Sequence, residues 1–182
     1  TVLIHPGHHL GDSWFHVEPD GQVHAFYLVC PEGVARHTAW DIARATSRDL
    51  ARWDLHGVVL RRGADDEWDG GCLATGSVLA GDDGYLMAYT AYGPLGPRIA
   101  LADSADLLAW RRIGPAKFAF EPALRVDFDL YDNKDAALFP STVRDPHGRP
   151  ALALLHRPSH TQGGLSVLPE GVAEPRASMW IS

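Results

Sequence analysis

Short apolar runs that follow glycine-containing turns recur along the chain. Runs rich in Tyr, Phe, Val and Leu cover residues 23–29, 85–91 and 149–155. Their length and composition are typical of buried or half-buried strands. Glycine supplies the positive φ that a tight turn between two strands requires. Each run therefore predicts a strand that leaves a tight turn. The three turns are Asp20-Gly21, Asp83-Gly84 and His147-Gly148.

A longer segment is repeated. Residues 42–57 and 99–114 align at an offset of 57 positions, and eight of the sixteen positions are identical. Each copy contains the pattern Ser-x-Asp-Leu-x-x-Trp. The second copy favours a strand and a turn over a helix across residues 39–53, although Ala, Arg and Leu are good helix formers. We expect the Asp of each copy to accept hydrogen bonds from turn amides, and the Leu and Trp to pack between sheets. These residues are Asp49, Leu50, Trp53, Asp106, Leu107 and Trp110.

One repeat unit thus contains four strands in sequence, which describes a four-stranded antiparallel blade. Blades repeated radially form a β-propeller. The predicted fold is all-β, with blades near residues 12–60, 70–118 and 135–182, the last one incomplete. A propeller needs about 4–8 blades to close. We therefore expect further C-terminal blades or another chain to complete the ring, and the 182-residue chain alone to be inactive.

Composition narrows the function classes. The chain has 46% hydrophobic and 21% charged residues and a net charge of −7, as a soluble globular protein does. A surface that binds phosphate backbones is usually basic, so no nucleic-acid partner is expected. No apolar run approaches the roughly 20 residues that span a bilayer, so no membrane partner is expected. No cofactor is indicated.

Two cysteines, Cys30 and Cys72, do not form a disulfide framework. We expect two buried free thiols, with a single bridge as the alternative. No signal peptide is visible in residues 1–10, and a cytoplasmic location fits best. Secretion remains open if a signal peptide has been removed.

Several stretches resemble glycoside hydrolases with five-bladed propellers. Residues 11–14 and 20–27 resemble the opening of families 32 and 43, and residues 45–53 resemble their "A-T-S-x-D-L-x-x-W" turn. Residues 69–77 resemble the family 32 stretch "G-C-F-S-G-S". Residues 133–140 and 155–158 resemble family 130, whose members are mannoside phosphorylases and mannosidases. The resemblance implies an enzyme that hydrolyses O-glycosyl bonds in a carbohydrate substrate.

Asp12 and Asp135 are the candidate catalytic residues. Glycoside cleavage uses two carboxylates that flank the scissile bond, and both residues begin a predicted blade. The resemblance implies that Asp12 is the nucleophile or general base and that Asp135 stabilises the oxocarbenium-like charge. It places the general acid, a Glu, beyond Ser182. The alternatives are that Asp12 caps a turn and that Asp135 forms a structural ion pair with Lys134.

Seven further residues are expected to bind substrate in the same funnel. The aromatic face of Trp14 suits the C–H face of a sugar, and Trp68 and Arg98 flank the inner strand of the second predicted blade and the loop at residues 93–97. The seven are Trp14, Trp68, Ser77, Arg98, Lys134, His156 and Arg157.

Two other functions stay open. In family 130 a matching Lys, His and Arg line a phosphate site, so Lys134, His156 and Arg157 allow a phosphorylase. Residues 74–77 lack the carboxylate of the family 130 acid, however, which argues against it. The second alternative is a glycan-binding propeller without catalysis. His5, His8 and His9 are expected to be solvated and not to bind metal, because zinc sites need three or four converging ligands.

Overall fold

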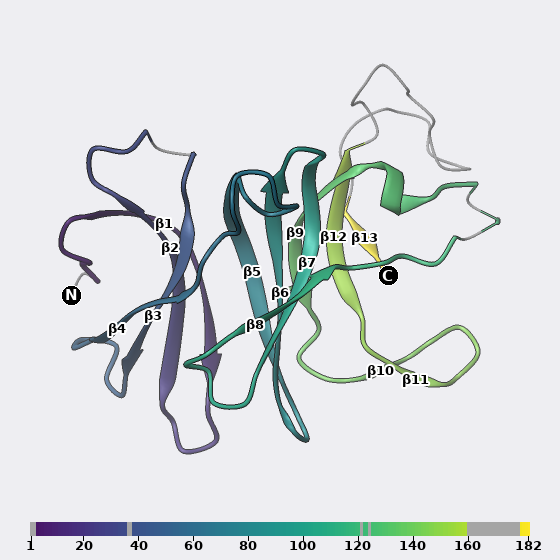
Figure 1. Ribbon diagram of the computed structural model, residues 1–182. Coiled ribbons are helices and arrows are strands. Elements are labelled where there is room, and N and C mark those ends of the chain that lie inside the picture. Colours follow the sequence, from purple (N-terminus) through teal and green to yellow (C-terminus); the bar gives the residue numbers. More distant parts are fainter. Residues whose placement is uncertain (1–2, 36–37, 121, 124, 160–178) are drawn as a thin grey trace.

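The three larger antiparallel sheets of the described residues lie side by side (Figure 1). A computed structural model describes residues 3–35, 38–120, 122–123, 125–159 and 179–182. The predicted all-β architecture with four-stranded antiparallel blades is confirmed. Within these ranges no helix is long and apolar enough to cross a membrane.

The first two sheets are complete blades in which neighbouring strands follow chain order. Residues 41–47 form a strand, as predicted, so the alternative of a helix in this region is excluded. Blade 1 contains β1 (His8–Val17), β2 (Val23–Pro31), β3 (Asp41–Ser47) and β4 (Asp54–Leu60). Blade 2 contains β5 (Cys72–Gly81), β6 (Gly84–Gly93), β7 (Gly96–Ser104) and β8 (Arg111–Pro115).

The third sheet, blade 3, has the order β13-β12-β9 among the described residues. Most of the connection between β12 and β13, residues 160–178, lies outside the described part of the chain. The turn at Gly148 closes the small β10–β11 hairpin between β9 and β12, with a φ of 80°. The elements are η1 (Phe128–Leu130), a single 3₁₀ turn, then β9 (Asp132–Leu138), β10 (Val143–Arg144), β11 (Pro150–Ala151), β12 (Leu154–Ser159) and β13 (Trp180–Ile181).

The repeated Ser-x-Asp-Leu-x-x-Trp segment forms the same turn in blades 1 and 2. Asp49 Oδ1 accepts hydrogen bonds from two turn amides, both at 2.8 Å. Asp106 Oδ1 accepts two at 2.8 and 3.0 Å. The Leu of each copy has a positive φ, 56° at Leu50 and 64° at Leu107. The predicted capping role of the two aspartates is confirmed.

The two leucines of this turn have different environments. Leu107 is 1% exposed in the core between blades 1 and 2, as predicted, whereas Leu50 is 61% exposed. The prediction that Leu50 packs between sheets is wrong for the described residues, because blade 1 has no neighbouring sheet on that side. Trp110 packs on the core with its ring 5.8 Å from that of Phe26, and Trp53 is half-buried against the outer face of blade 1.

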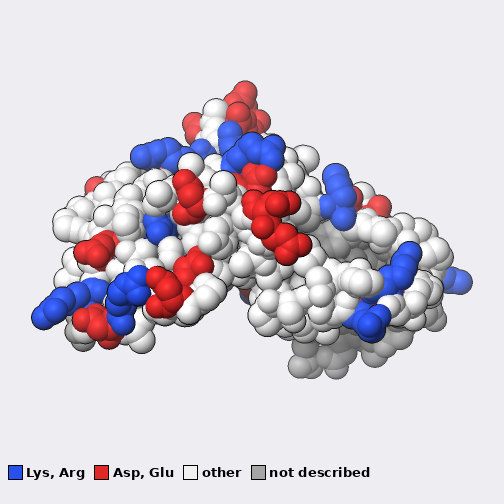
Figure 2. Space-filling view, turned by 90° about the horizontal axis from the view of Figure 1, so that it is seen from below, with Lys and Arg blue, Asp and Glu red and all other residues white. Residues whose placement is uncertain are grey.

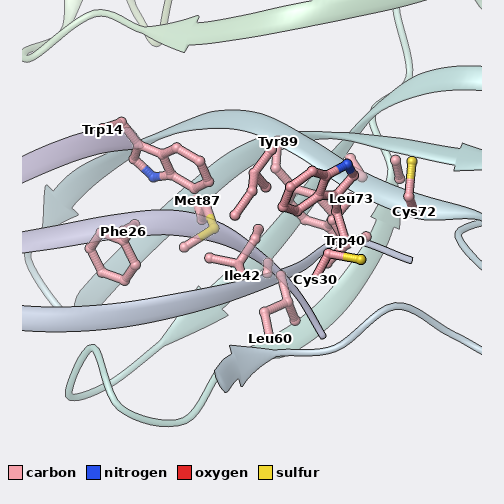
Figure 3. Packing of buried hydrophobic residues seen from close by; sticks show 14 of the residues in the cluster. Trp14, Phe26, Cys30, Trp40, Ile42, Leu60, Cys72, Leu73, Met87 and Tyr89 are labelled. Atoms are coloured by element: carbon pink, nitrogen blue, oxygen red, sulfur yellow. The ribbon is translucent and has the colours of Figure 1, made fainter. Parts of the chain in front are cut away.

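The largest apolar core lies between blades 1 and 2, where side chains of β1–β3 face those of β5 and β6 (Figure 3). Trp14, Phe26, Met87 and Tyr89 belong to it. Cys30 and Cys72 are buried in the same core as free thiols, which confirms that expectation. The cytoplasmic location that we inferred from them stays a prediction.

The first strands of neighbouring blades contact each other. β1 packs against β5, and β5 packs against β9. Residues on these three strands are therefore brought close together although they are far apart in sequence.

Candidate functional site

The first strand of each blade carries a β-bulge. In β1, Gly11 and Asp12 together oppose Leu28, because the register shifts between Leu10 and Ser13. In β5, Thr75 is the extra residue between Ala74 and Gly76. A bulge re-aims a side chain and is frequent beside active sites.

The bulge in β9 follows the same pattern. Lys134 pairs with Arg157 and Ala137 pairs with Leu155, so Asp135 and Ala136 together oppose His156. Each first strand therefore turns one polar side chain out of the regular alternation: Asp12 in blade 1, Thr75 in blade 2 and Asp135 in blade 3.

The three bulged residues line one cavity of about 380 Å³. Lys134 and Tyr92 also line it, and Trp40 and Leu28 contribute apolar surface. Asp12 and Asp135 thus share a cavity and do not point to opposite rims. An apolar wall with a few converging polar groups is the usual form of a small-molecule site.

Asp12 is held from the neighbouring blade. Thr75 Oγ1 donates a hydrogen bond of 2.5 Å to Asp12 Oδ2. A Cβ added to the neighbouring Gly11 would lie 3.0 Å from Leu28 Cβ, so a side chain there would be tightly packed and would push Leu28 aside. Asp12 does not cap a turn, and that alternative is wrong.

Asp135 is held by an arginine of its own sheet. Arg157 Nε donates to Asp135 Oδ2 at 2.5 Å, and a second guanidinium nitrogen of Arg157 also contacts this oxygen. The alternative of a structural Lys134–Asp135 ion pair is therefore wrong. Lys134 has no ion pair within the described ranges, so its charge is available to the cavity.

The phenol of Tyr92 also lines the cavity, and no sequence motif marks this residue as a site residue. Burial, with smaller contributions from Cys72 and Asp135, raises the pKa of Tyr92. Its hydroxyl group therefore stays protonated at neutral pH.

Trp14 and Ser77, predicted to bind substrate, lie elsewhere. Trp14 is 7% exposed and stacks on Phe26 within the core between blades 1 and 2. Ser77 Oγ accepts a 2.7 Å hydrogen bond from the Leu138 amide and so joins blade 2 to blade 3. Neither residue lines the cavity.

His156 is also a structural residue in this arrangement. It is fully buried, lies between Asn133 and Ser182 in a hydrogen-bonded chain, and stacks on Phe118 at 4.7 Å. Burial lowers its pKa to about 4, so it is neutral at physiological pH. The predicted convergence of Lys134, His156 and Arg157 is not observed, because His156 is buried and Arg157 is paired with Asp135.

Trp68 and Arg98 line a second, smaller cavity of about 190 Å³. Arg98 donates to Asp132 Oδ1 at 3.1 Å, which orients its guanidinium group. The prediction that Trp68 and Arg98 line the same funnel as Asp12 and Asp135 is not met, because they line a different cavity.

Charges and possible metal ligands are distributed without a dominant cluster. On the face shown in Figure 2, acidic and basic side chains are interspersed. In the described part of the chain, no group of three His, Cys, Asp or Glu residues could hold a metal ion. His5 instead hydrogen-bonds to Tyr27 at 3.1 Å, and His8 to the Pro6 carbonyl at 3.0 Å.

Solved structures with this fold come from several glycoside hydrolases. A glycosyl hydrolase from Bacteroides ovatus matches 93% of this chain and 50% of its own, at 19% identity and a TM-score of 0.60. Fructan 1-exohydrolase IIa from Cichorium intybus matches 86% of this chain and 28% of its own, at 16% identity and a TM-score of 0.60. A thermostable family-43 glycoside hydrolase matches 84% of this chain and 42% of its own, at 19% identity and a TM-score of 0.56.

These similarities and the blade topology define a propeller of the glycoside hydrolase type. The model of the "Glycosyl hydrolases family 32 N-terminal domain" matches residues 11–148. The chain therefore belongs to this family of five-bladed β-propellers. It spans half or less of the length of the three solved structures. A search of curated proteins finds no match.

Proposed function

We propose that the protein containing this chain hydrolyses a glycosidic bond, with Asp12 as general base or nucleophile and Asp135 as the stabilising carboxylate. The single observation that carries this proposal is the shared cavity into which the bulges of β1 and β9 turn these two side chains. Membership of a glycoside hydrolase family supports it.

The surroundings of the two carboxylates suit different roles. Asp12 is solvent-exposed, and among the described residues Thr75 is the hydrogen-bond donor to one of its carboxylate oxygens. Its other oxygen is left to approach a sugar carbon or a water molecule. Asp135 is half-buried and fixed by Arg157, so it cannot swing towards a reacting atom. A fixed negative charge of this kind stabilises the positive charge that develops on the sugar ring in the transition state.

The reaction also needs a proton donor for the leaving oxygen. Tyr92 does not suit this role, because burial raises its pKa and an efficient general acid has a pKa near the working pH. In the proposed mechanism a carboxylic acid from another blade, in line with the Glu implied by the family resemblance, reaches the same cavity.

Hydrolysis is favoured over phosphorolysis. A phosphate site built from side chains usually places Arg or Lys donors around the anion. Here the Arg157 guanidinium neutralises Asp135 and His156 is buried, which leaves Lys134 as the cation that lines the cavity.

The test is incubation of the full-length gene product with a panel of glycosides, with and without inorganic phosphate. The panel includes fructans, β-xylosides and β-1,2-mannosides, because a fructan exohydrolase, a β-xylosidase and a structure reported with β-1,2-mannan-targeting hydrolases share the fold. We expect free sugar at a rate independent of phosphate. Release of a sugar phosphate would favour the phosphorylase, and binding without turnover would favour a glycan-binding propeller.

A further inference from the structure

Thr90 joins the centre of blade 2 to the β9 bulge of blade 3. It lies in β6 and is 1% exposed. Its Oγ1 accepts a 3.0 Å hydrogen bond from the backbone amide of Asp135. Thr90 therefore contacts the main chain of Asp135, the candidate stabilising residue, whereas Arg157 contacts the Asp135 side chain.

The backbone of Asp135 needs such support. Its φ is 62°, in the left-handed region that residues other than glycine rarely adopt. Such a conformation costs on the order of 1–3 kcal/mol and persists only where the surroundings fix it. Asp135 and Ala136 share one partner position on β12, and the Asp135 amide donates to Thr90 Oγ1 of the neighbouring blade.

We propose that Thr90 is a positioning residue: its hydroxyl oxygen fixes the backbone of Asp135 in the bulged conformation and thereby directs the carboxylate to the cavity. This inference rests on the proposed function of Asp135. Two contacts define the carboxylate position, because Thr90 sets the backbone and Arg157 sets the side-chain end. Without the first contact, the bulge would relax towards regular pairing, and the side chain would shift within the cavity.

A second interblade hydrogen bond provides a matched control. Ser77 Oγ accepts from the Leu138 amide at 2.7 Å, so it also joins blade 2 to β9 through a hydroxyl acceptor and a backbone donor. Its partner Leu138 lies three residues beyond Asp135 on β9, and neither Ser77 nor Leu138 lines the cavity. Ser77→Ala and Thr90→Val each remove one hydroxyl acceptor from a backbone amide of β9. Only the amide that Thr90 accepts from lies at the β9 bulge.

The experiment compares the full-length wild type with Thr90→Val, Thr90→Ser and Ser77→Ala. Amide hydrogen exchange at Asp135 reports the bulge directly, and kcat and KM report its consequence. We expect Thr90→Val to lose protection at the Asp135 amide and to lower kcat by roughly 10- to 100-fold with little change in KM, because small displacements of a catalytic group are costly. Thr90→Ser keeps the acceptor and should restore both properties, while Ser77→Ala should alter neither.

The outcomes separate this inference from the proposed function. An unchanged exchange rate at Asp135 in folded Thr90→Val would overturn the positioning role, whatever the activity. Lost protection with an unchanged kcat would also overturn it. A wild type without glycosidase activity would reject the proposed function, yet the exchange comparison would still show whether Thr90 fixes the bulge. If Thr90→Val does not fold, Thr90→Ser decides. A folded Thr90→Ser protein that loses the wild-type exchange rate and kcat would count against the inference.

Discussion

Thr75 Oγ1 lies 2.5 Å from Asp12 Oδ2 and donates a hydrogen bond across the boundary between blades 1 and 2. Both residues occupy β-bulges, so the contact exists only because two strands break their alternation at the same level. The relative position of the first two blades is thereby coupled to the orientation of the candidate base or nucleophile.

The first prediction concerns this contact. Thr75→Val keeps the shape of the side chain and removes the donor, which leaves Asp12 free to rotate. A hydrogen bond to a charged group contributes about 1.5–3 kcal/mol, and each ~1.4 kcal/mol of lost transition-state stabilisation is roughly tenfold in rate. We expect kcat to fall by roughly 10-fold or more and Thr75→Ser to retain most of the activity. Equal kinetics for Thr75→Val and the wild type would show that the hydrogen bond does not matter.

The second prediction uses the two copies of the turn. Leu107 is 1% exposed and Leu50 is 61% exposed, while both have a similar positive φ. Leu107→Ala should lower the free energy of unfolding of this chain by about 2–5 kcal/mol, as for other buried leucines. Leu50→Ala should change it by about 0.5 kcal/mol or less. Urea unfolding monitored by tryptophan fluorescence distinguishes the two, and equal losses would contradict the burial seen here.

The third prediction concerns pH. Burial lowers the pKa of His156 from 6.5 to about 4. Between pH 6.5 and about 4, His156 is protonated in the unfolded chain but stays neutral in the folded protein. The free energy of unfolding therefore falls as the pH falls from 6.5 towards 4. Above pH 6.5 this contribution is fully present.

The measurement is the urea midpoint of the wild type and of His156→Gln across this pH range. The variant should show a weaker dependence, although part of it remains because burial also lowers the pKa of His24 to about 4. His147→Gln, at an exposed turn, is the matched control and should keep the wild-type slope. A slope that is the same in all three proteins would exclude His156 as the cause.

Sequence reasoning reached the fold because the repeat is local. Each copy of the Ser-x-Asp-Leu-x-x-Trp turn is stabilised by hydrogen bonds between its own residues, such as those accepted by Asp49 and Asp106. The turn can therefore be predicted from the local sequence alone. The exposure of Leu50 depends instead on which sheet lies next to blade 1. That information is not contained in the repeat.

The candidate site was only partly predictable, because bulges change which face a side chain occupies. The family resemblance and the start of a predicted blade both point to Asp12 and Asp135. Ser77 and Thr75 lie in the same short stretch, yet the bulge at Thr75 directs the two hydroxyl groups to different neighbours. Thr90 carried no signal of its own, since its role depends on the backbone of another blade.

The most direct test of the central claim is the kcat of Asp12→Asn in the full-length protein on a glycoside that the wild type hydrolyses. The amide keeps the shape of the side chain but loses the charge, and the matched control is Asp83→Asn at the exposed turn of blade 2. We predict a loss of several orders of magnitude in kcat for Asp12→Asn, an unchanged urea midpoint, and wild-type kinetics for Asp83→Asn. Wild-type turnover by a folded Asp12→Asn protein would contradict the account, because the carboxylate turned into the cavity by the β1 bulge would then have no part in the reaction.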